Sequence, residues 1–468
     1  MKFLNILFLC CVFAGFSLAQ NSNQPSEPLL FKARIGFDDA KERIIGQKFF
    51  DDDKKLVLIG IKSIQFWDVT KGKLLESHPH EIPNLSDTDS VITVSPDGQK
   101  AIVLDSLSWR LIRKEKKVSA TVWDLQTGRQ ITVLERPTES IRAAGWSKNG
   151  ETLVTYSGEF SDKRTEVCFW DGNDFKLRAA VLLQGYVNYK KLTDDGKVFL
   201  AKTDKMESYK FRYDSGDYLS ARDTTTAKLV QNFSSGGEVQ ALSYGTGLTE
   251  NQEYVVMSAG KYDRQRVSVW KMGGSDLPIY EISPEKKGGT IDLLSVVGDY
   301  FVIYQNKKLE VYNAADGKIK LTIPNQKRFT GNFRSFELSP DKRTLVINDC
   351  NRAEFYDVAA AQRKFEMDLV CKTDFDFVST SYRDFDVLRF QPNGNLLLTA
   401  SDKTVRLWNA EDGRLLQTLA DPNRIENKKK DKNKDDGLSW LAGWIRNGDF
   451  LFAFGADDKT ILLWEMKK

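Results

Sequence analysis

Histidine, on which many catalytic sites depend, is nearly absent from this chain. Among 468 residues only His78 and His80 occur, both in the segment HPHEIP. A Ser-His-Asp triad would have to use one of them, and the sequence contains neither a G-x-S-x-G nucleophile motif nor a phosphate-binding P-loop. Together with Glu81 they would hold a metal only weakly. We therefore expect a solvated loop here, a protein that is not an enzyme, and no metal or cofactor.

An excess of one charge is also lacking. The chain has 68 Lys and Arg residues against 65 Asp and Glu residues, which gives a net charge of +3. Nonspecific binding to nucleic acid needs a basic surplus, so this balance argues against a nucleic-acid partner.

Long apolar runs are absent beyond the N-terminus. The first residues read MKFLNILFLCCVFAGFSLAQ, with Lys2 before an apolar centre and small residues up to Ala19. This pattern predicts a secretory signal peptide over residues 1–19, cleaved after Ala19, and the run is short for a membrane span. An uncleaved anchor is the alternative. We expect an exported (periplasmic or extracellular) monomer without a transmembrane segment, in which residues 20–27 form a short linker.

What the chain does contain is a repeat. A strand-like segment that ends in an aromatic and a polar residue recurs at intervals of about 50 residues, in the range of known repeat architectures. The terminal aromatic residue, which we call the anchor, is Trp67, Trp123, Trp170, Trp270, Tyr312, Tyr356, Trp408 or Trp464, and Arg222 replaces it in a degenerate copy. Turn motifs such as SPDG and QPNG precede the anchors. Short β-rich segments between such turns predict an all-β chain.

The copy LLLTASDKTVRLWNAEDGRLLQTL, residues 396–419, resembles a WD-repeat blade, and GADDKTILLWE, residues 455–465, is similar. The resemblance covers essentially the whole mature chain and implies a β-propeller of four-stranded antiparallel blades over residues 28–468. The Gly-His pair usual in the family is missing, so its Asp-His-Ser/Thr-Trp network cannot form. We expect a divergent, WD-like propeller that is held mainly by apolar burial between blades.

The last repeat stops after its third strand, whereas a spare strand-like segment, residues 29–35, precedes the first. We expect this N-terminal strand to complete the last blade and to close a single ring. Nine blades are favoured because residues 186–233 still contain four strand-like stretches. The alternative is eight blades, with the copy around Arg222 as an excursion.

Cysteine is too scarce for a disulfide scaffold, since only three remain after the signal peptide. Cys350 and Cys371 end the second strand and follow the fourth strand of one repeat, which places both on the same face of a propeller. A disulfide between them is one reading for an exported protein, and two independent buried thiols are the other. Cys168 lies in a strand and is expected to pack.

The stretch between turn glycine and anchor is longest in the second to fourth repeats and milder in the fifth. The excess falls between the second and third strands, whose connections share one face with those between blades. Arg and aromatic residues accumulate there, as in binding hot spots. The predicted binding residues are Trp109, Arg110, Arg113, Lys114, Phe160, Arg164, Tyr209, Arg212, Tyr262 and Arg264. Extended hairpins with solvated charges are the alternative.

A fold of this kind hosts many functions, so function must be argued from a site. We expect a non-catalytic scaffold that binds a protein or an anionic glycan through this face. The alternative is a propeller-type metal-dependent hydrolase or lactonase, with carboxylates converging at the channel mouth.

Overall fold

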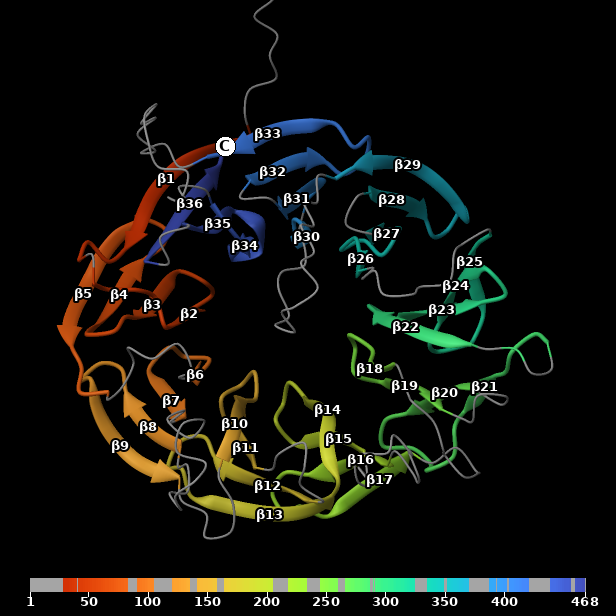
Figure 1. Cartoon of the computed structure of the whole chain (residues 1–468), viewed down its shortest axis with the longest axis horizontal. Coiled ribbons are helices and arrows are strands. Elements are labelled where there is room, and N and C mark those ends of the chain that lie inside the picture. Colours follow the sequence, from red (N-terminus) through yellow and green to blue (C-terminus); the bar gives the residue numbers. More distant parts are fainter. Residues whose placement is uncertain are drawn as a thin grey trace, which may run out of the picture.

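Nine four-stranded antiparallel sheets stand as blades in a closed ring (Figure 1). The computed structural model describes residues 28–39, 41–82, 91–104, 120–134, 141–157, 164–204, 218–233, 245–259, 266–286, 289, 291–324, 335–348, 352–369, 387–392, 394–401, 404–420, 438–455 and 459–467. The prediction of nine blades is confirmed and the eight-blade alternative is wrong, because the degenerate copy around Arg222 forms the third strand of a complete blade. Within the described ranges, no helix has the length and apolarity of a membrane span.

Each blade has strands a to d from the channel outward. Blade 1 contains β2 (Gly46–Phe50), β3 (Lys55–Ile59), β4 (Ser63–Asp68) and β5 (Lys73–Pro79); blade 2 contains β6 (Val91–Val94), β7 (Lys100–Leu104), β8 (Ala120–Asp124) and β9 (Arg129–Leu134); blade 3 contains β10 (Ile141–Trp146), β11 (Thr152–Ser157), β12 (Arg164–Asp171) and β13 (Leu177–Gln184). Blade 4 contains β14 (Tyr186–Leu192), β15 (Val198–Asp204), β16 (Tyr218–Asp223) and β17 (Leu229–Phe233); blade 5 contains β18 (Thr246–Leu248), β19 (Tyr254–Ala259), β20 (Arg266–Lys271) and β21 (Tyr280–Ile282); blade 6 contains β22 (Asp292–Val297), β23 (Tyr300–Gln305), β24 (Lys308–Asn313) and β25 (Ile319–Ile323). Blade 7 contains β26 (Ser335–Leu338), β27 (Thr344–Asn348), β28 (Arg352–Asp357) and β29 (Gln362–Asp368); blade 8 contains β30 (Val387–Phe390), β31 (Leu396–Ser401), β32 (Thr404–Asn409) and β33 (Leu415–Leu419); blade 9 contains β34 (Leu438–Ile445), a 3₁₀ turn (Arg446–Gly448), β35 (Phe450–Gly455), β36 (Thr460–Met466) and, as its strand d, β1 (Leu29–Gly36).

The N-terminal strand closes the ring, as predicted. β1 pairs antiparallel with β36, from Leu29 opposite Met466 to Gly36 opposite Thr460, and covers what would otherwise be an open edge. The backbone of Leu29 is also held by Gln417 of blade 8, whose amide accepts from its N–H at 3.1 Å and donates to its carbonyl at 3.0 Å. The two ends of the described chain therefore lie side by side on the rim (Figure 1).

The core lies between blades. One cluster joins Val57 and Ile64 of blade 1 to Ala101 and Trp123 of blade 2, and further clusters of this kind link neighbouring blades around the ring. Strand b is mostly buried on both faces and reads as a nearly continuous apolar run, for example KLVLI in β3. These clusters agree with the prediction that the propeller is held mainly by apolar burial between blades.

The aromatic anchors are structural, as the repeat predicted; Trp123, Trp170, Trp270 and Trp464 are each at most 5% exposed. In blades 3 and 8 the indole donates to a strand-b threonine, Trp170 to Thr155 at 2.9 Å and Trp408 to Thr399 at 2.8 Å. In blades 1, 2, 6 and 7 the acceptor lies two positions before the anchor, on the same face of the strand. These acceptors are Gln65, Thr121, Glu310 and Glu354. In these six blades, local pairs thus satisfy the anchor side chains without a histidine.

One face of the ring carries the short a–b and c–d turns. In most a–b turns a Ser or Thr hydroxyl donates to an Asp or Asn two residues later, as Thr193 does to Asp195 at 2.7 Å, and also accepts the backbone N–H that opens strand b. In blade 1 three aspartates, residues 51–53, form the a–b turn, each with φ near +55°. We call this side the turn face and the opposite side the loop face.

The two histidines do not lie in a solvated loop, and that prediction is wrong. His78 belongs to β5. His80 is half-buried: its Nε2 lies 3.1 Å from the carbonyl oxygen of Gly60, and its Nδ1 accepts the N–H of Ile82 at 3.2 Å. Burial lowers the pKa of His80, although the Gly60 carbonyl and the charge of Glu42 oppose this shift. The imidazole serves as a bridge between two backbone segments.

Candidate binding site

Most of the predicted binding residues lie outside the described residues. The exception is Arg164, which is exposed at the start of β12 and lies opposite Gln184 of β13. The residues outside are Trp109, Arg110, Arg113, Lys114, Phe160, Tyr209, Arg212, Tyr262 and Arg264, and the cysteines Cys350 and Cys371 join them. Cys168, in contrast, is buried with Trp170 in the core between blades 2 and 3.

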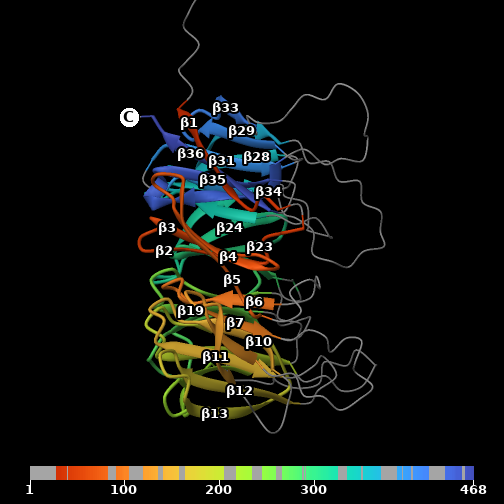
Figure 2. The ribbon, with the colours of Figure 1, turned by 90° about the vertical axis from the view of Figure 1, so that its left-hand side faces the viewer.

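The strands do locate the connections to which these residues belong. Between strands b and c, blade 2 has residues 105–119, blade 3 residues 158–163, blade 4 residues 205–217 and blade 5 residues 260–265. The same connection spans only residues 60–62 in blade 1 and residues 306–307 in blade 6. The excess length therefore falls between strands b and c of four consecutive blades, as the sequence indicated. Figure 2 shows the ring from its side, with its strands running between the two faces.

The described strand ends that border the loop face are firmly held. Arg266, at the start of β20, forms a 2.7 Å ion pair with Glu281, which also accepts from Ser268 at 2.8 Å. Thr165 of β12 donates to the carbonyl of Gly185 at 2.8 Å. These contacts fix the bases from which the long connections leave. They also give Arg266 a structural partner, so its charge is already engaged.

The strands that line the channel offer one notable ionisable pair. Arg389 of β30 donates to Glu337 of β26 at 3.3 Å and so links blades 8 and 7. Burial raises the pKa of Glu337, and the charge of Arg389 opposes that shift. Among the residues described, no three His, Cys, Asp or Glu side chains are grouped so that they could hold a metal ion.

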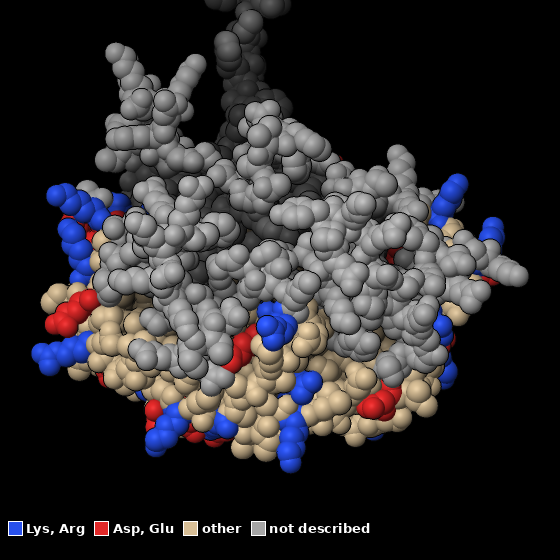
Figure 3. Space-filling model, turned by 60° about the horizontal axis from the view of Figure 1, so that its bottom comes forward, with Lys and Arg blue, Asp and Glu red and all other residues tan. Residues whose placement is uncertain are grey.

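The visible described surface in Figure 3 carries scattered side chains of both signs and no single-sign field. Thus no charged patch on this rim singles out a partner.

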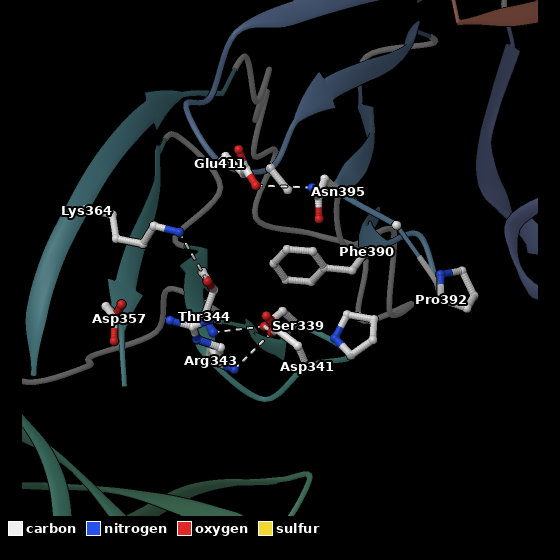
Figure 4. Close-up of a pocket in the computed structure, with 13 residues that line it drawn as sticks. Ser339, Asp341, Arg343, Thr344, Asp357, Lys364, Phe390, Pro392, Asn395 and Glu411 are labelled. Carbon is white, nitrogen blue, oxygen red and sulfur yellow. Dashed lines mark hydrogen bonds between the residues drawn. The ribbon is translucent and has the colours of Figure 1, made fainter. Parts of the chain in front are cut away.

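The turn face is hollowed between blades 7 and 8 by a cavity of about 650 Å³ (Figure 4). Its walls come from the a–b turns of both blades, the c–d turn of blade 8, the adjoining ends of β27 and β28, and β29, and the Phe390 ring lies among them. The polar or charged lining residues are Ser339, Asp341, Arg343, Thr344, Asp357, Lys364, Asn395 and Glu411. No pattern in the sequence indicated this pocket.

Some of these polar groups are already engaged. Ser339 donates to the Asp341 carboxylate, which also accepts the backbone N–H of Arg343 at 3.0 Å. Burial would raise the pKa of Asp341, but these hydrogen bonds and the charges of Arg343 and Lys364 outweigh it, and the pKa is lowered. Asn395 donates to Glu411 at 3.1 Å. Asp341 is therefore an ionised part of the turn.

Comparison with known proteins finds a family model that matches one part of the chain and solved structures of low identity. A family model for the WD domain, G-beta repeat, matches residues 383–409, a range that includes β30, β31 and β32. Among solved structures, the C-terminal WD40 domain of Sif2 matches with 9% identity and a TM-score of 0.44, over 94% of this chain and 99% of that chain. The Dos1 propeller matches with 12% identity and a TM-score of 0.46, over 93% of this chain and 95% of that chain.

Proposed function

We propose that this WD-repeat β-propeller is an exported, non-catalytic scaffold that binds a protein or an anionic glycan through its loop face. The observation that carries the proposal is the position of the long b–c connections, which occur in four consecutive blades, 2 to 5. Loops on a rigid scaffold are where binding residues concentrate. The signal-like N-terminus supports export.

The composition of these connections suggests the chemistry of the partner. Residues 109–117 read WRLIRKEKK and contain a single acidic residue, and residues 209–213 read YKFRY. Arg and aromatic side chains dominate binding hot spots because they bury a large area and still donate hydrogen bonds. Such segments favour a partner that presents carboxylates or other anionic groups.

The alternative hydrolase or lactonase would need carboxylates that converge at the channel mouth. The channel pair that we can describe, Glu337 with Arg389, is a carboxylate neutralised by a cation, and the described residues contain no group suited to a metal. These residues therefore give the alternative no support.

Charge reversal of the loop face tests the proposal. We expect a variant with Arg110, Arg113, Arg212 and Arg264 all replaced by Glu to lose at least tenfold in affinity for a partner identified by affinity capture from the exported fraction. The matched control reverses four exposed turn-face lysines, Lys71, Lys176, Lys197 and Lys318, and should bind normally. Undiminished binding by the folded loop-face variant would refute the proposal, as would equal losses in both variants.

A further inference from the structure

The pocket between blades 7 and 8 can be judged against an equivalent junction in the same ring. Between blades 3 and 4, Thr152 donates to the carbonyl of Gly196 in the next blade at 3.0 Å. Arg178 bridges Thr152 at 3.2 Å and Asp171 at 2.5 Å. At that junction the threonine, the carboxylate and the cation therefore satisfy one another, and the neighbouring turn closes over them.

Blade 7 has the same threonine and carboxylate, but a lysine replaces the arginine. Thr344 pairs with Asp357 across β27 and β28 as Thr152 pairs with Asp171, and Lys364 stands where blade 3 has Arg178. Lys364 Nζ reaches the Thr344 hydroxyl at 3.4 Å, but no ion pair joins it to Asp357 or to another described residue. In blade 3 the cation Arg178 and the carboxylate Asp171 pair with each other. Their blade 7 equivalents, Lys364 and Asp357, do not form an ion pair, and both line the pocket.

The turn of blade 8 also differs from its equivalent. Gln391 replaces the usual Ser or Thr, and its amide donates to Gly448 of blade 9 at 2.9 Å. Gly394 lacks the positive φ of Gly196, and its N–H lies 3.4 Å from the carbonyl oxygen of Gln391, against 2.8 Å for Gly196 and Thr193. The blade 8 turn is bonded towards blade 9, and the described residues show no hydrogen bond from Thr344 to Gly394. The space between the turns is the cavity.

We propose that this pocket binds a saccharide residue that carries one carboxylate, such as a hexuronic acid. Arg343 and Lys364 are exposed cations without an ion pair to a described residue, and a ligand carboxylate would supply their counterion. Asp357 accepts the backbone N–H of Ala360 at 2.8 Å, and Glu411 accepts from Asn395 at 3.1 Å. The remaining lone pairs of both carboxylates can accept from sugar hydroxyls. Phe390 belongs to the core between blades 7 and 8 and is 8% exposed, so only a small part of its ring can contact the sugar. The volume is typical of small-molecule sites.

The charged side chains that line the pocket limit the charge that a ligand can carry. Three carboxylates, Asp341, Asp357 and Glu411, face two cations across the cavity, so the lining is net negative by one. A single ligand carboxylate can lie against Arg343 and Lys364, whereas a dianionic phosphate or a strongly acidic peptide would place further negative charge beside Asp341, Asp357 and Glu411, and a basic ligand would meet the two cations. A ligand with a single carboxylate and several hydroxyl groups matches both the two cations and the three carboxylates of the lining. The proposal concerns the turn face and does not depend on the loop face.

Calorimetric titration of the whole mature chain tests it, with methyl β-D-glucuronide as the probe. Methyl β-D-glucoside, which has similar hydroxyls and no carboxylate, should bind at least tenfold more weakly. The double variant Arg343→Gln, Lys364→Gln should lose at least tenfold in glucuronide affinity. Lys320→Gln is the matched control, because Lys320 has the position of Lys364 in blade 6 and lies outside the pocket lining.

Three results would overturn the inference: no glucuronide binding, equal affinity for the two sugars, or unchanged affinity in the double variant. A glutamate-rich peptide that displaces the glucuronide with higher affinity would also overturn it, in favour of an acidic peptide site. The loop-face variant with four glutamates should bind glucuronide normally. Failure of this proposal is therefore distinguishable from failure of the proposed function.

Discussion

Replacement of Leu29 by alanine tests whether the first strand holds the ring closed. Leu29 is 1% exposed and packs between blades 8 and 9, whereas its neighbour Leu30 on the same strand is 53% exposed. The two residues are chemically identical and adjacent, and they differ only in the side of the strand that they occupy. Leu30→Ala is thus an internal control for any effect of the substitution on β1 itself.

The expected cost can be derived from what each side chain contacts. Removal of a buried leucine side chain costs about 2–5 kcal/mol, because transfer and cavity terms add. An exposed position changes the free energy of unfolding by no more than about 0.5 kcal/mol. Deletion of residues 28–36 removes the burial of Leu29 and Ile35 and both hydrogen bonds to Gln417, together about 4–9 kcal/mol. That is comparable to the whole stability of an ordinary domain.

Urea unfolding followed by tryptophan fluorescence measures the difference, since Trp464 lies next to β1 with its ring 6.0 Å from that of Phe31. We expect Leu29→Ala to lower the transition midpoint clearly, Leu30→Ala to leave it in place, and the deletion to lower the melting temperature sharply. Equal midpoints for the two point variants, or an unchanged melting curve for the deletion, would show that β1 does not hold the ring closed.

Two further predictions concern backbone geometry and pH. Gly98 and Gly273 both have φ of +70°, but a Cβ at Gly98 would lie 2.5 Å from Phe50 while one at Gly273 meets nothing within 4 Å. Gly273→Ala should therefore lower the free energy of unfolding by about 1–2 kcal/mol, because alanine is strained at positive φ. Gly98→Ala should lower it by about 1–3 kcal/mol more, because the added Cβ clashes with Phe50. Urea unfolding measures both losses, and equal losses would contradict the contact with Phe50. Because burial lowers the pKa of His80, the unfolded chain binds the proton first, so the free energy of unfolding should fall as pH drops below about 6.5. His80→Gln should lose that part of the pH dependence, and an NMR titration of His80 with a midpoint at or above 6.5 would contradict the assignment.

The propeller architecture was predictable because the strands and turns of each blade repeat along the sequence at a nearly constant interval. Each anchor repeats the same local sequence, and the copy around Arg222 still has enough strand and turn signals to form blade 4 despite losing its aromatic residue. The spare N-terminal strand and the incomplete last repeat predicted closure by simple counting. The long b–c connections followed from spacing alone, whereas their side chains remain a prediction.

Contacts across the repeat were less accessible to sequence reasoning. The environment of His80 depends on how the end of β5 passes Gly60, and no local pattern encodes that approach. The acceptors of the anchor side chains, such as Glu310 for Tyr312, could have been found, because residues two apart share one face of a strand. Their signal is a polar residue at that offset inside an otherwise apolar run.

The blade 7–8 pocket follows from two small departures in sequence. Thr344, Asp357 and Lys364 match Thr152, Asp171 and Arg178 in type and position, so a comparison by residue class finds no difference between the junctions. The planar guanidinium of arginine can bridge two acceptors, while a lysine ammonium is a single point of charge. The other departure is Gln391, whose amide reaches Gly448 where a serine or threonine would bond within its own turn. Between these two junctions, such departures mark the place where groups that satisfy one another in blade 3 line an open cavity in blade 7.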